Sequence, residues 1–189
     1  IKFTRQSSIE DLINILPTID FICHAAGVNR PEDDNEFDKV NADLTKRLCI
    51  ELHRVKKHIP VIFTSSVHVH KKNKYGASKR KAEKYLIEYS KKTKIPVYIF
   101  RLPHVIGKWC RPNYNSVVST FCHNISRNIP IKIDDPSYEL NLVYIDDLID
   151  TILKIFNNKT KTNTFCEVKP TYPINVGDLA KLLYAFKSS

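Results

Sequence analysis

The sequence is poor in several residue types that mark particular classes of protein. It has no methionine, four glycines and one tryptophan among 189 residues. No apolar run approaches the roughly 18 residues of a membrane span, and the N-terminus has no signal-peptide pattern. We therefore expect a cytoplasmic protein without a membrane segment. Because even the first position is not methionine, we also expect the chain to be a segment of a longer protein.

The cysteines and histidines do not form a recognisable metal-binding pattern. The five cysteines are odd in number, widely scattered and free of any Cys-x-x-Cys spacing, which favours reduced thiols over a disulfide framework or zinc site. His68 and His70 alternate on an expected loop without a third ligand nearby in the sequence, which favours a surface pair. We expect no metal site. The cysteines are Cys23, Cys49, Cys110, Cys122 and Cys166.

The formal net charge of +10 raises the question of nucleic-acid binding. The lysines, however, are spread along the whole chain, and no arginine-rich block with interleaved aromatic residues occurs. Solvated helix faces therefore explain the charge better than a nucleic-acid surface does. The same positive field would favour an anionic ligand such as a nucleotide.

Short apolar runs alternate with amphipathic stretches along the chain. The order strand, helix, strand, helix, strand with nearly continuous apolar strands is typical of a parallel sheet with helices on both faces. Expected strands begin in residues 20–27 and occupy 60–66, 96–102 and 139–145. Expected helices occupy residues 37–55, 75–93, 114–125, 146–156 and 175–186.

In such sheets, ligands bind beyond the carboxyl ends of the strands. Three segments follow expected strands and contain most of the unusual chemistry: residues 24–31, 65–75 and 101–115. We expect them to converge on one crevice. Asn41 lies on a neighbouring helix, where a role near this crevice and a structural role are equally compatible with the sequence. Asp146 is expected to cap the helix that follows it.

A tyrosine and a lysine lie four residues apart at the start of the helix expected over residues 75–93. Tyr75 and Lys79 fall on one helical face, about 5–6 Å apart between Cβ atoms, and none of the other eight tyrosines has a lysine at this spacing. A nearby positive charge favours tyrosinate and lowers the tyrosine pKa from about 10. Ser65 and Ser66 end the preceding strand, where a hydroxyl would hold a substrate oxygen against the tyrosine.

Four short motifs occur in an order that resembles the extended short-chain dehydrogenases/reductases, the NAD-dependent epimerase/dehydratase family. They are IFTSS, YGASK, RLPHVIG and LVYIDD. The segments HAAGVNRP, GKWCRPNYNSVVSTFC and LLYAFKSS more specifically resemble the reductase domain of CapF-type enzymes of capsular polysaccharide synthesis. This resemblance implies an α/β fold with a Rossmann-like, doubly wound parallel sheet and a small C-terminal substrate-binding portion.

The resemblance also implies how the chain is organised. Residues 1–189 would form a single domain whose N-terminal βα unit is missing. Residues 1–108 would supply most of the dinucleotide-binding sheet, and residues 109–189 most of the substrate-binding portion. A cupin domain follows the reductase domain in full-length members of the CapF-type group.

Roles for individual residues follow from the same resemblance. Tyr75 would be the general acid, and Lys79 would lower its pKa and reach the nicotinamide ribose. Ser66 aligns best with the carbonyl-binding hydroxyl, with Ser65 second. The remaining positions would bind the cofactor (His24, Ala25, Ala26, Gly27 and Pro103) or the sugar nucleotide (His104, Arg111, Asn113, Tyr114 and Asn115).

The implied activity is reduction of the C4 ketone of a UDP-linked N-acetylated 4-keto-6-deoxyhexose by NADPH, in the synthesis of capsular or surface polysaccharide precursors. The expected partner is a UDP-sugar, and a homodimer is compatible with the resemblance. Val67 and His68 follow the serines where dehydratases usually have Asp-Glu, which argues against dehydration. A 4-epimerase and a non-catalytic binding or scaffold relative are the alternatives.

The sequence also departs from the family pattern. The Gly-x-x-Gly-x-x-Gly turn that cradles pyrophosphate is absent, which predicts poor cofactor affinity for this segment. Either the gene product is longer, or the chain is a degraded relative. His104 stands where the family has asparagine. Arg5 follows the strand-like IKFTR, and no acidic residue occurs in residues 1–9, which favours NADP over NAD.

Overall fold

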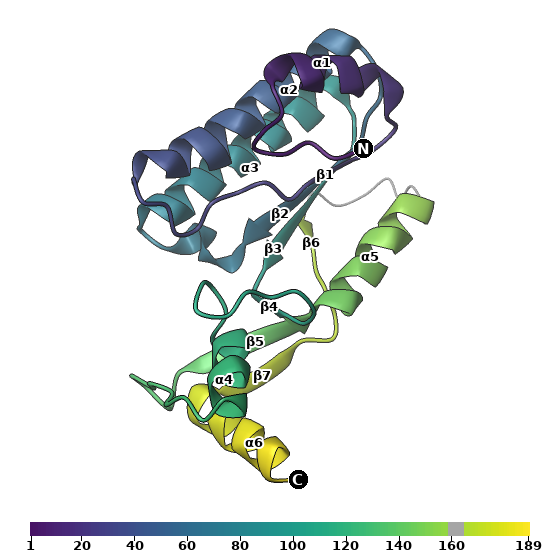
Figure 1. The fold of residues 1–189 in the computed structure, drawn as a ribbon. Coiled ribbons are helices and arrows are strands. Elements are labelled where there is room, and N and C mark those ends of the chain that lie inside the picture. The colour runs from purple at the N-terminus through teal and green to yellow at the C-terminus, as the bar shows by residue number, and fades with distance from the viewer. Residues whose placement is uncertain (159–164) are drawn as a thin grey trace. The chain divides into compact units, whose positions relative to one another are not determined.

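The computed structural model describes residues 1–158 and 165–189, which form two compact units (Figure 1). Unit 1 contains Ile1–Arg101 and Phe156–Glu167, and unit 2 contains Leu102–Ile155 and Val168–Ser189. The helices are α1 (Ile9–Ile15), α2 (Leu44–Val55), α3 (Lys74–Thr93), α4 (Val117–Ser126), α5 (Ile145–Asn158) and α6 (Val176–Ser188), with shorter helical turns η1 (Leu16–Thr18), η2 (Phe37–Asp43) and η3 (Val67–His70). The strands are β1 (Ile22–His24), β2 (Val61–Ser66), β3 (Val97–Leu102), β4 (His104–Ile106), β5 (Glu139–Tyr144), β6 (Phe165–Cys166) and β7 (Tyr172–Asn175).

Unit 1 is built on a four-stranded sheet of order β1-β2-β3-β6. The β1–β2 and β3–β6 pairs are parallel. Successive residues Val61, Ile62 and Phe63 of β2 are all fully buried. Because neighbouring side chains of a strand point to opposite faces, both faces of the sheet are covered, as expected for parallel sheets. The α/β fold and the three strands predicted within residues 20–102 are therefore confirmed.

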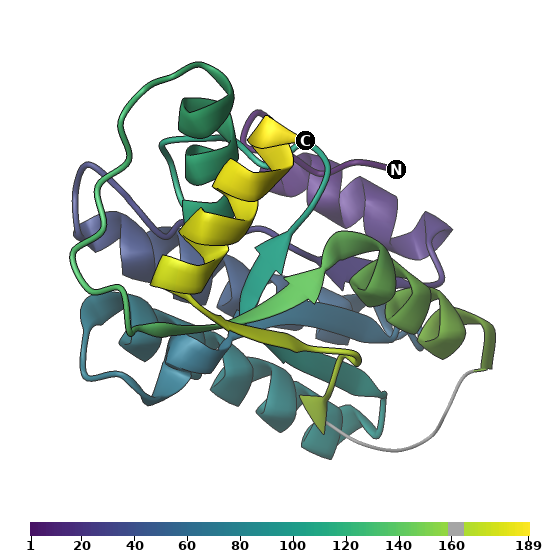
Figure 2. The same cartoon turned by 90° about the horizontal axis from the view of Figure 1, so that it is seen from below.

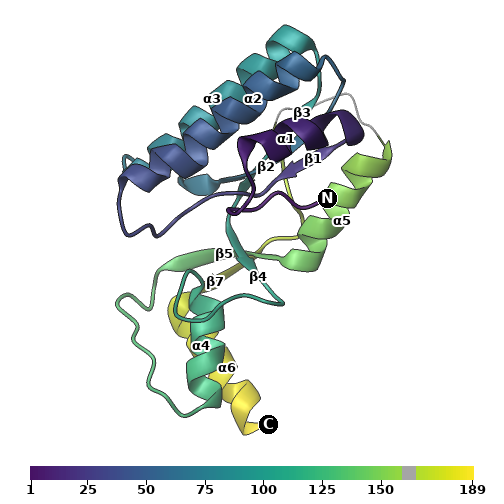
Figure 3. The same ribbon diagram turned by 45° about the horizontal axis from the view of Figure 1, so that its top comes forward.

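One continuous apolar cluster joins α1, α2 and α3 to the sheet of unit 1. Its members include Leu12, Leu52 and Leu86, one from each helix, together with Phe63 from β2. Figures 1 and 3 show α2 and α3 lying side by side, and the two helices pack against each other. This packing fixes α3, the helix that carries YGASK, against the end of β2.

Three local predictions are wrong. IKFTR forms no strand: the Thr4 amide donates to Ser7 Oγ and the Ser7 amide to the Thr4 carbonyl, so these groups make a turn before α1. Residues 37–43 form a π-helical turn, η2, in place of the first part of a continuous α-helix. Asp146 lies within the first turn of α5, which already begins at Ile145, and pairs with Lys108 at 3.1 Å.

Unit 2 contains a three-stranded sheet of order β4-β5-β7, in which β5 is parallel to β4 and antiparallel to β7. Helices α4 and α6 lie side by side (Figure 2) and pack with the sheet around a second apolar cluster. Phe121, Leu142 and Leu179 belong to this cluster. The helices and the strand predicted within residues 114–186 are present, whereas β4 and β7 were not predicted.

None of the helices in the described parts of the chain is both long and apolar enough to cross a membrane.

Candidate active site

The N-terminal turn of α3 holds Tyr75 against the turn that follows β2. Asn73 caps α3 by accepting from the Gly76 amide at 2.7 Å. A Cβ atom at Gly76 would lie 2.5 Å from the His68 carbonyl oxygen and 2.7 Å from that of Lys71, so only glycine allows this approach. The backbone after β2 therefore rests directly on the helix that carries Tyr75.

Ser66 and Tyr75 are brought together by this packing. Ser66 ends β2, is buried, and accepts from the His68 amide at 3.2 Å. Burial raises the pKa of the half-buried Tyr75, and a hydrogen bond between its side chain and that of Ser66 lowers it in part. The net effect of burial is a raised Tyr75 pKa. The sequence had predicted a lowered Tyr75 pKa, caused by the charge of Lys79.

Lys79 lies one turn further along α3 and is almost fully buried. Its Nζ donates to the Thr64 carbonyl at 3.1 Å and lies 4.9 Å from the centre of the Phe63 ring. Burial lowers its pKa to about 8, and the negative charge of Glu83 acts in the opposite direction. The ammonium group is thus held at the end of β2, where Ser66 also lies.

The backbone after β1 passes close to this ammonium group. A Cβ atom at Gly27 would lie 3.0 Å from Lys79 Nζ and 3.0 Å from Asn41 Oδ1. Ala25, Ala26 and Gly27 are exposed. The segment predicted to touch the cofactor therefore stands exposed beside Lys79.

His24, which begins this segment, is buried, with Nε2 2.8 Å from Thr45 Oγ1. Burial lowers its pKa to about 4, and the charge of Lys79 adds to the effect. His24 is therefore neutral near pH 7 and contributes to the framework under the segment.

Asn41 connects the same segment to α3. Its amide accepts from the Val28 N–H at 2.8 Å and donates to the Val28 carbonyl at 2.9 Å and to Ser78 Oγ at 3.0 Å. Ser78 in turn donates to the Tyr75 carbonyl at 2.8 Å. Asn41 is thus a structural residue next to the site. Sequence reasoning missed Ser78, whose signal is a small polar residue on the buried face of a helix.

The remaining predicted positions lie elsewhere. Arg5 is exposed in the turn before α1. The others belong to unit 2, so the predicted convergence of all three segments stays a prediction. Pro103 and His104 are half-buried where β3 gives way to β4, and four exposed residues lie in the loop before α4: Arg111, Asn113, Tyr114 and Asn115.

Part of that loop is held by α4. The Asn113 amide donates to Thr120 Oγ1 at 2.9 Å, and the Asn113 backbone has a positive φ of 55°. The Arg111 guanidinium lies 5.7 Å from the centre of the Tyr114 ring. An exposed guanidinium beside an aromatic ring suits a planar or phosphorylated ligand.

A cavity of about 320 Å³ in unit 1 is lined in part by His24, Ala25 and Ala26 and otherwise mainly by apolar side chains of α1, β1 and α2. Its size is at the lower end for a ligand pocket, about 300–1,000 Å³. The ammonium of Lys79 and the exposed backbone of residues 25–27 are the groups predicted to contact a dinucleotide. A glycine-rich anchor for a pyrophosphate is not among them, since the four glycines are isolated in the sequence.

The chain resembles several known proteins over nearly its whole length. A family model described as the NAD dependent epimerase/dehydratase family matches residues 1–168. A curated protein of Pseudomonas aeruginosa, "UDP-2-acetamido-2,6-beta-L-arabino-hexul-4-ose reductase", is 48% identical over 189 residues, which are 100% of this chain and 51% of that protein. The chain therefore spans about half the length of this relative.

Two solved structures are also similar to the chain. The capsular polysaccharide assembling protein CapF from Staphylococcus aureus matches with a TM-score of 0.84 and 39% identity over 97% of this chain and 50% of that one. UDP-glucuronic acid 4-epimerase from Bacillus cereus, solved with NAD, matches with a TM-score of 0.85 and 20% identity over 97% of this chain and 65% of that one. The second likeness concerns the fold alone.

Proposed function

The chain belongs to the NAD dependent epimerase/dehydratase family, and we propose that it carries the catalytic groups of a reductase for the C4 ketone of a UDP-linked N-acetylated 4-keto-6-deoxyhexose. One observation carries this proposal. The Tyr75 side chain is hydrogen-bonded to that of Ser66, and the Lys79 ammonium is held at the Thr64 carbonyl, two residues before Ser66, in a chain that is 48% identical to a curated keto-sugar reductase. The likeness to CapF supports a role in capsular or surface polysaccharide precursor synthesis.

Ketone reduction requires a hydride at the carbon and a proton at the oxygen. In the proposed reaction, Ser66 holds the carbonyl oxygen and Tyr75 donates the proton, as a general acid. The raised pKa of Tyr75 keeps its hydroxyl protonated at neutral pH, which a proton donor needs. Lys79 stabilises the tyrosinate that forms after the proton has left.

The hydride would come from a nicotinamide cofactor when one is bound. We propose that Lys79 contacts the nicotinamide ribose of this cofactor. Residues 24–27 and Pro103 are proposed as further cofactor contacts. NADP is proposed over NAD because no acidic residue occurs in residues 1–9, where Arg5 is exposed and could pair with a 2′-phosphate. A glycine-rich anchor for its pyrophosphate is not present in these 189 residues.

The substrate positions proposed in unit 2 are His104, Arg111, Asn113, Tyr114 and Asn115. Arg111 would pair with the diphosphate and the asparagine amides with the sugar or base. The organisation into a mostly dinucleotide-binding part, 1–108, and a mostly substrate-binding part, 109–189, is part of this proposal. The cytoplasmic location and the homodimer stay predictions.

The test is turnover of NADPH with a UDP-4-keto-6-deoxy sugar. Tyr75→Phe should lower kcat by about 100-fold or more, because a positioned general acid contributes roughly 10²–10⁴-fold. Tyr85→Phe, on the same helix, is the matched control and should keep wild-type turnover. Thermal unfolding of both variants should stay near that of wild type. Unchanged turnover in Tyr75→Phe would overturn the proposed mechanism.

A further inference from the structure

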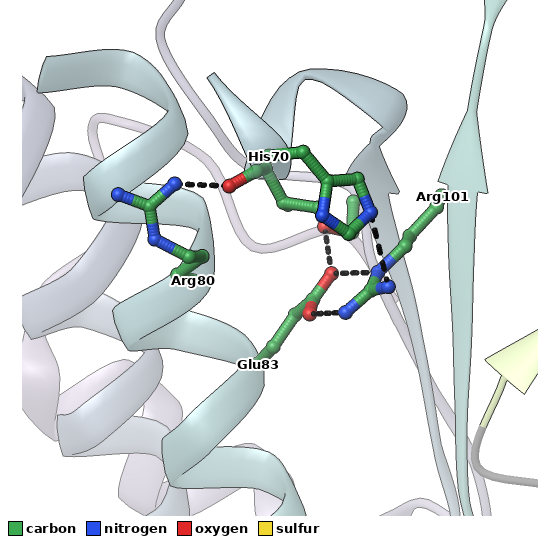
Figure 4. A network of polar contacts seen from close by, with 6 residues as sticks. His70, Arg80, Glu83 and Arg101 are labelled. Atoms are coloured by element: carbon green, nitrogen blue, oxygen red, sulfur yellow. Dashed lines mark hydrogen bonds and ion pairs between the residues drawn. The ribbon is translucent and has the colours of Figure 1, made fainter. Parts of the chain in front are cut away.

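A buried carboxylate, Glu83, lies on α3 one turn beyond Lys79 and is 3% exposed. It accepts from Arg101, with Nε at 3.1 Å and Nη2 at 2.7 Å (Figure 4). It also accepts from Ser65 Oγ at 2.6 Å. These contacts join α3 to the ends of β2 and β3. Both carboxylate oxygens are satisfied, as a buried charge requires.

The Glu83 contacts separate the roles of two adjacent serines. The sequence left both Ser65 and Ser66 as candidates for the carbonyl-binding hydroxyl. In the structure, Ser65 donates its proton to Glu83, whereas Ser66 shares a hydrogen bond with Tyr75. A hydroxyl that already donates to a buried carboxylate has no proton left for a substrate oxygen.

Two positively charged side chains lie near Glu83, one on the same helix and one on β3. Lys79 is four residues earlier on α3, which places the two side chains on one face of the helix. Arg101 approaches from β3, with its guanidinium 4.2 Å from the centre of the Phe165 ring and Nη1 3.4 Å from His70 Nε2. The groups near Lys79 are the Thr64 carbonyl, the Phe63 ring, neutral His24 and Glu83, of which Glu83 carries the negative charge.

We propose that Glu83 is a positioning residue of the reductase site: it engages Ser65, so that Ser66 faces Tyr75, and its charge keeps Lys79 protonated. This inference rests on the proposed function. According to this inference, Glu83 affects both the pH range over which the enzyme turns over and the stability of the protein. A purely structural ion pair with Arg101 would change stability alone.

The test compares pH profiles of kcat for three variants. In Glu83→Gln, loss of the negative charge removes the interaction that raises the pKa of Lys79, and Arg101 is left with its positive charge uncompensated. Lys79 then loses its proton at lower pH, so the alkaline limb of the profile should move to lower pH. Glu83→Asp keeps the charge and should restore the limb toward its wild-type position.

Ser65→Ala is the matched control, because it removes a hydrogen bond to Glu83 and leaves the charge in place. It should lower the thermal midpoint, and it should lower kcat because Ser66 is held less firmly, but the alkaline limb should stay at its wild-type pH. If Glu83→Gln lowers the thermal midpoint while its alkaline limb stays at the wild-type pH, Glu83 is merely structural and the inference is wrong.

A titration separates this inference from the proposed function. NMR of lysine side chains labelled at Cε, with the Lys79 signal assigned by Lys79→Arg, follows the ammonium directly and needs no turnover. If the Lys79 signal titrates at lower pH in Glu83→Gln than in wild type, the inference is supported. This holds even if the wild-type protein shows no reductase activity, a result that would overturn only the proposed function. An unshifted Lys79 titration overturns the inference even in an active reductase.

Discussion

At the scale of single residues, burial sets the protonation states of the site. It raises the pKa of Tyr75 and lowers those of Lys79 and His24, because a low-dielectric surrounding disfavours the charged form. Opposing interactions are local: the Ser66 hydrogen bond acts on Tyr75 and the Glu83 charge acts on Lys79. Perturbed pKa values of this kind cluster at functional sites.

His24 makes the stability of unit 1 depend on pH. Its pKa is about 4 in the folded protein against 6.5 as the ordinary value, so the unfolded chain binds a proton that the folded protein does not. Stability is therefore lost as pH falls from 6.5 toward 4, by an amount on the order of 3 kcal/mol.

His24→Gln can keep a hydrogen bond to Thr45 without titrating. Urea unfolding between pH 7 and pH 4 should therefore show a smaller loss of stability in this variant than in wild type. Equal losses in the two proteins would show that His24 is not held neutral by burial.

At the scale of elements, α3 is the scaffold of the site. Tyr75, Ser78, Lys79, Ala82 and Glu83 share its inward face at spacings of three and four residues, and the last four are buried. The four polar residues of this face contact different neighbours, so one helix holds the turn after β2, the segment after β1 and the ends of β2 and β3. The π-helical turn η2 places Asn41 between α3 and the segment after β1.

Removal of the Asn41 side chain tests this connection. Asn41→Ala leaves the Val28 N–H and carbonyl without their partners, and each unsatisfied buried group costs about 1–3 kcal/mol. The free energy of unfolding, measured with urea, should fall by roughly 3 kcal/mol.

Asn35→Ala is the matched control, since Asn35 is exposed, and it should change stability by less than about 0.5 kcal/mol. Equal effects of the two substitutions would contradict the role assigned to Asn41.

Elements with a strong local pattern could be predicted from the sequence, and elements that depend on distant partners could not. Continuous apolar runs identified β2 and β3, and helical spacing identified α3. By contrast, β4 and β7 are short, and their pairing with β5 is not encoded in any local period. IKFTR has strand-like composition, but its backbone groups bond within a turn.

The same distinction applies to the site. Tyr75 and Lys79 are four residues apart on one helix, so their relation is visible in the sequence. The separation of Ser65 from Ser66 depends on Glu83, 18 residues further along the chain. The sign of the Tyr75 pKa shift depends on burial, which neighbouring residues in the sequence do not determine.

At the scale of the whole molecule, the proposed proton-transfer groups lie in unit 1 and the proposed sugar-nucleotide residues lie in unit 2. It spans about half the length of the curated reductase that it resembles. The glycine-rich phosphate turn is not among its residues.

Isotope transfer tests the central claim most directly. The protein in its longest form is incubated with NADPH deuterated at the transferable position of the nicotinamide and with a UDP-4-keto-6-deoxy sugar, and the product is examined by mass spectrometry and NMR. The account predicts one deuterium at C4 of the sugar for each NADPH consumed. A sugar inverted at C4 with no net consumption of NADPH would show an epimerase, and absence of any product would show a non-catalytic relative; either result would contradict the account.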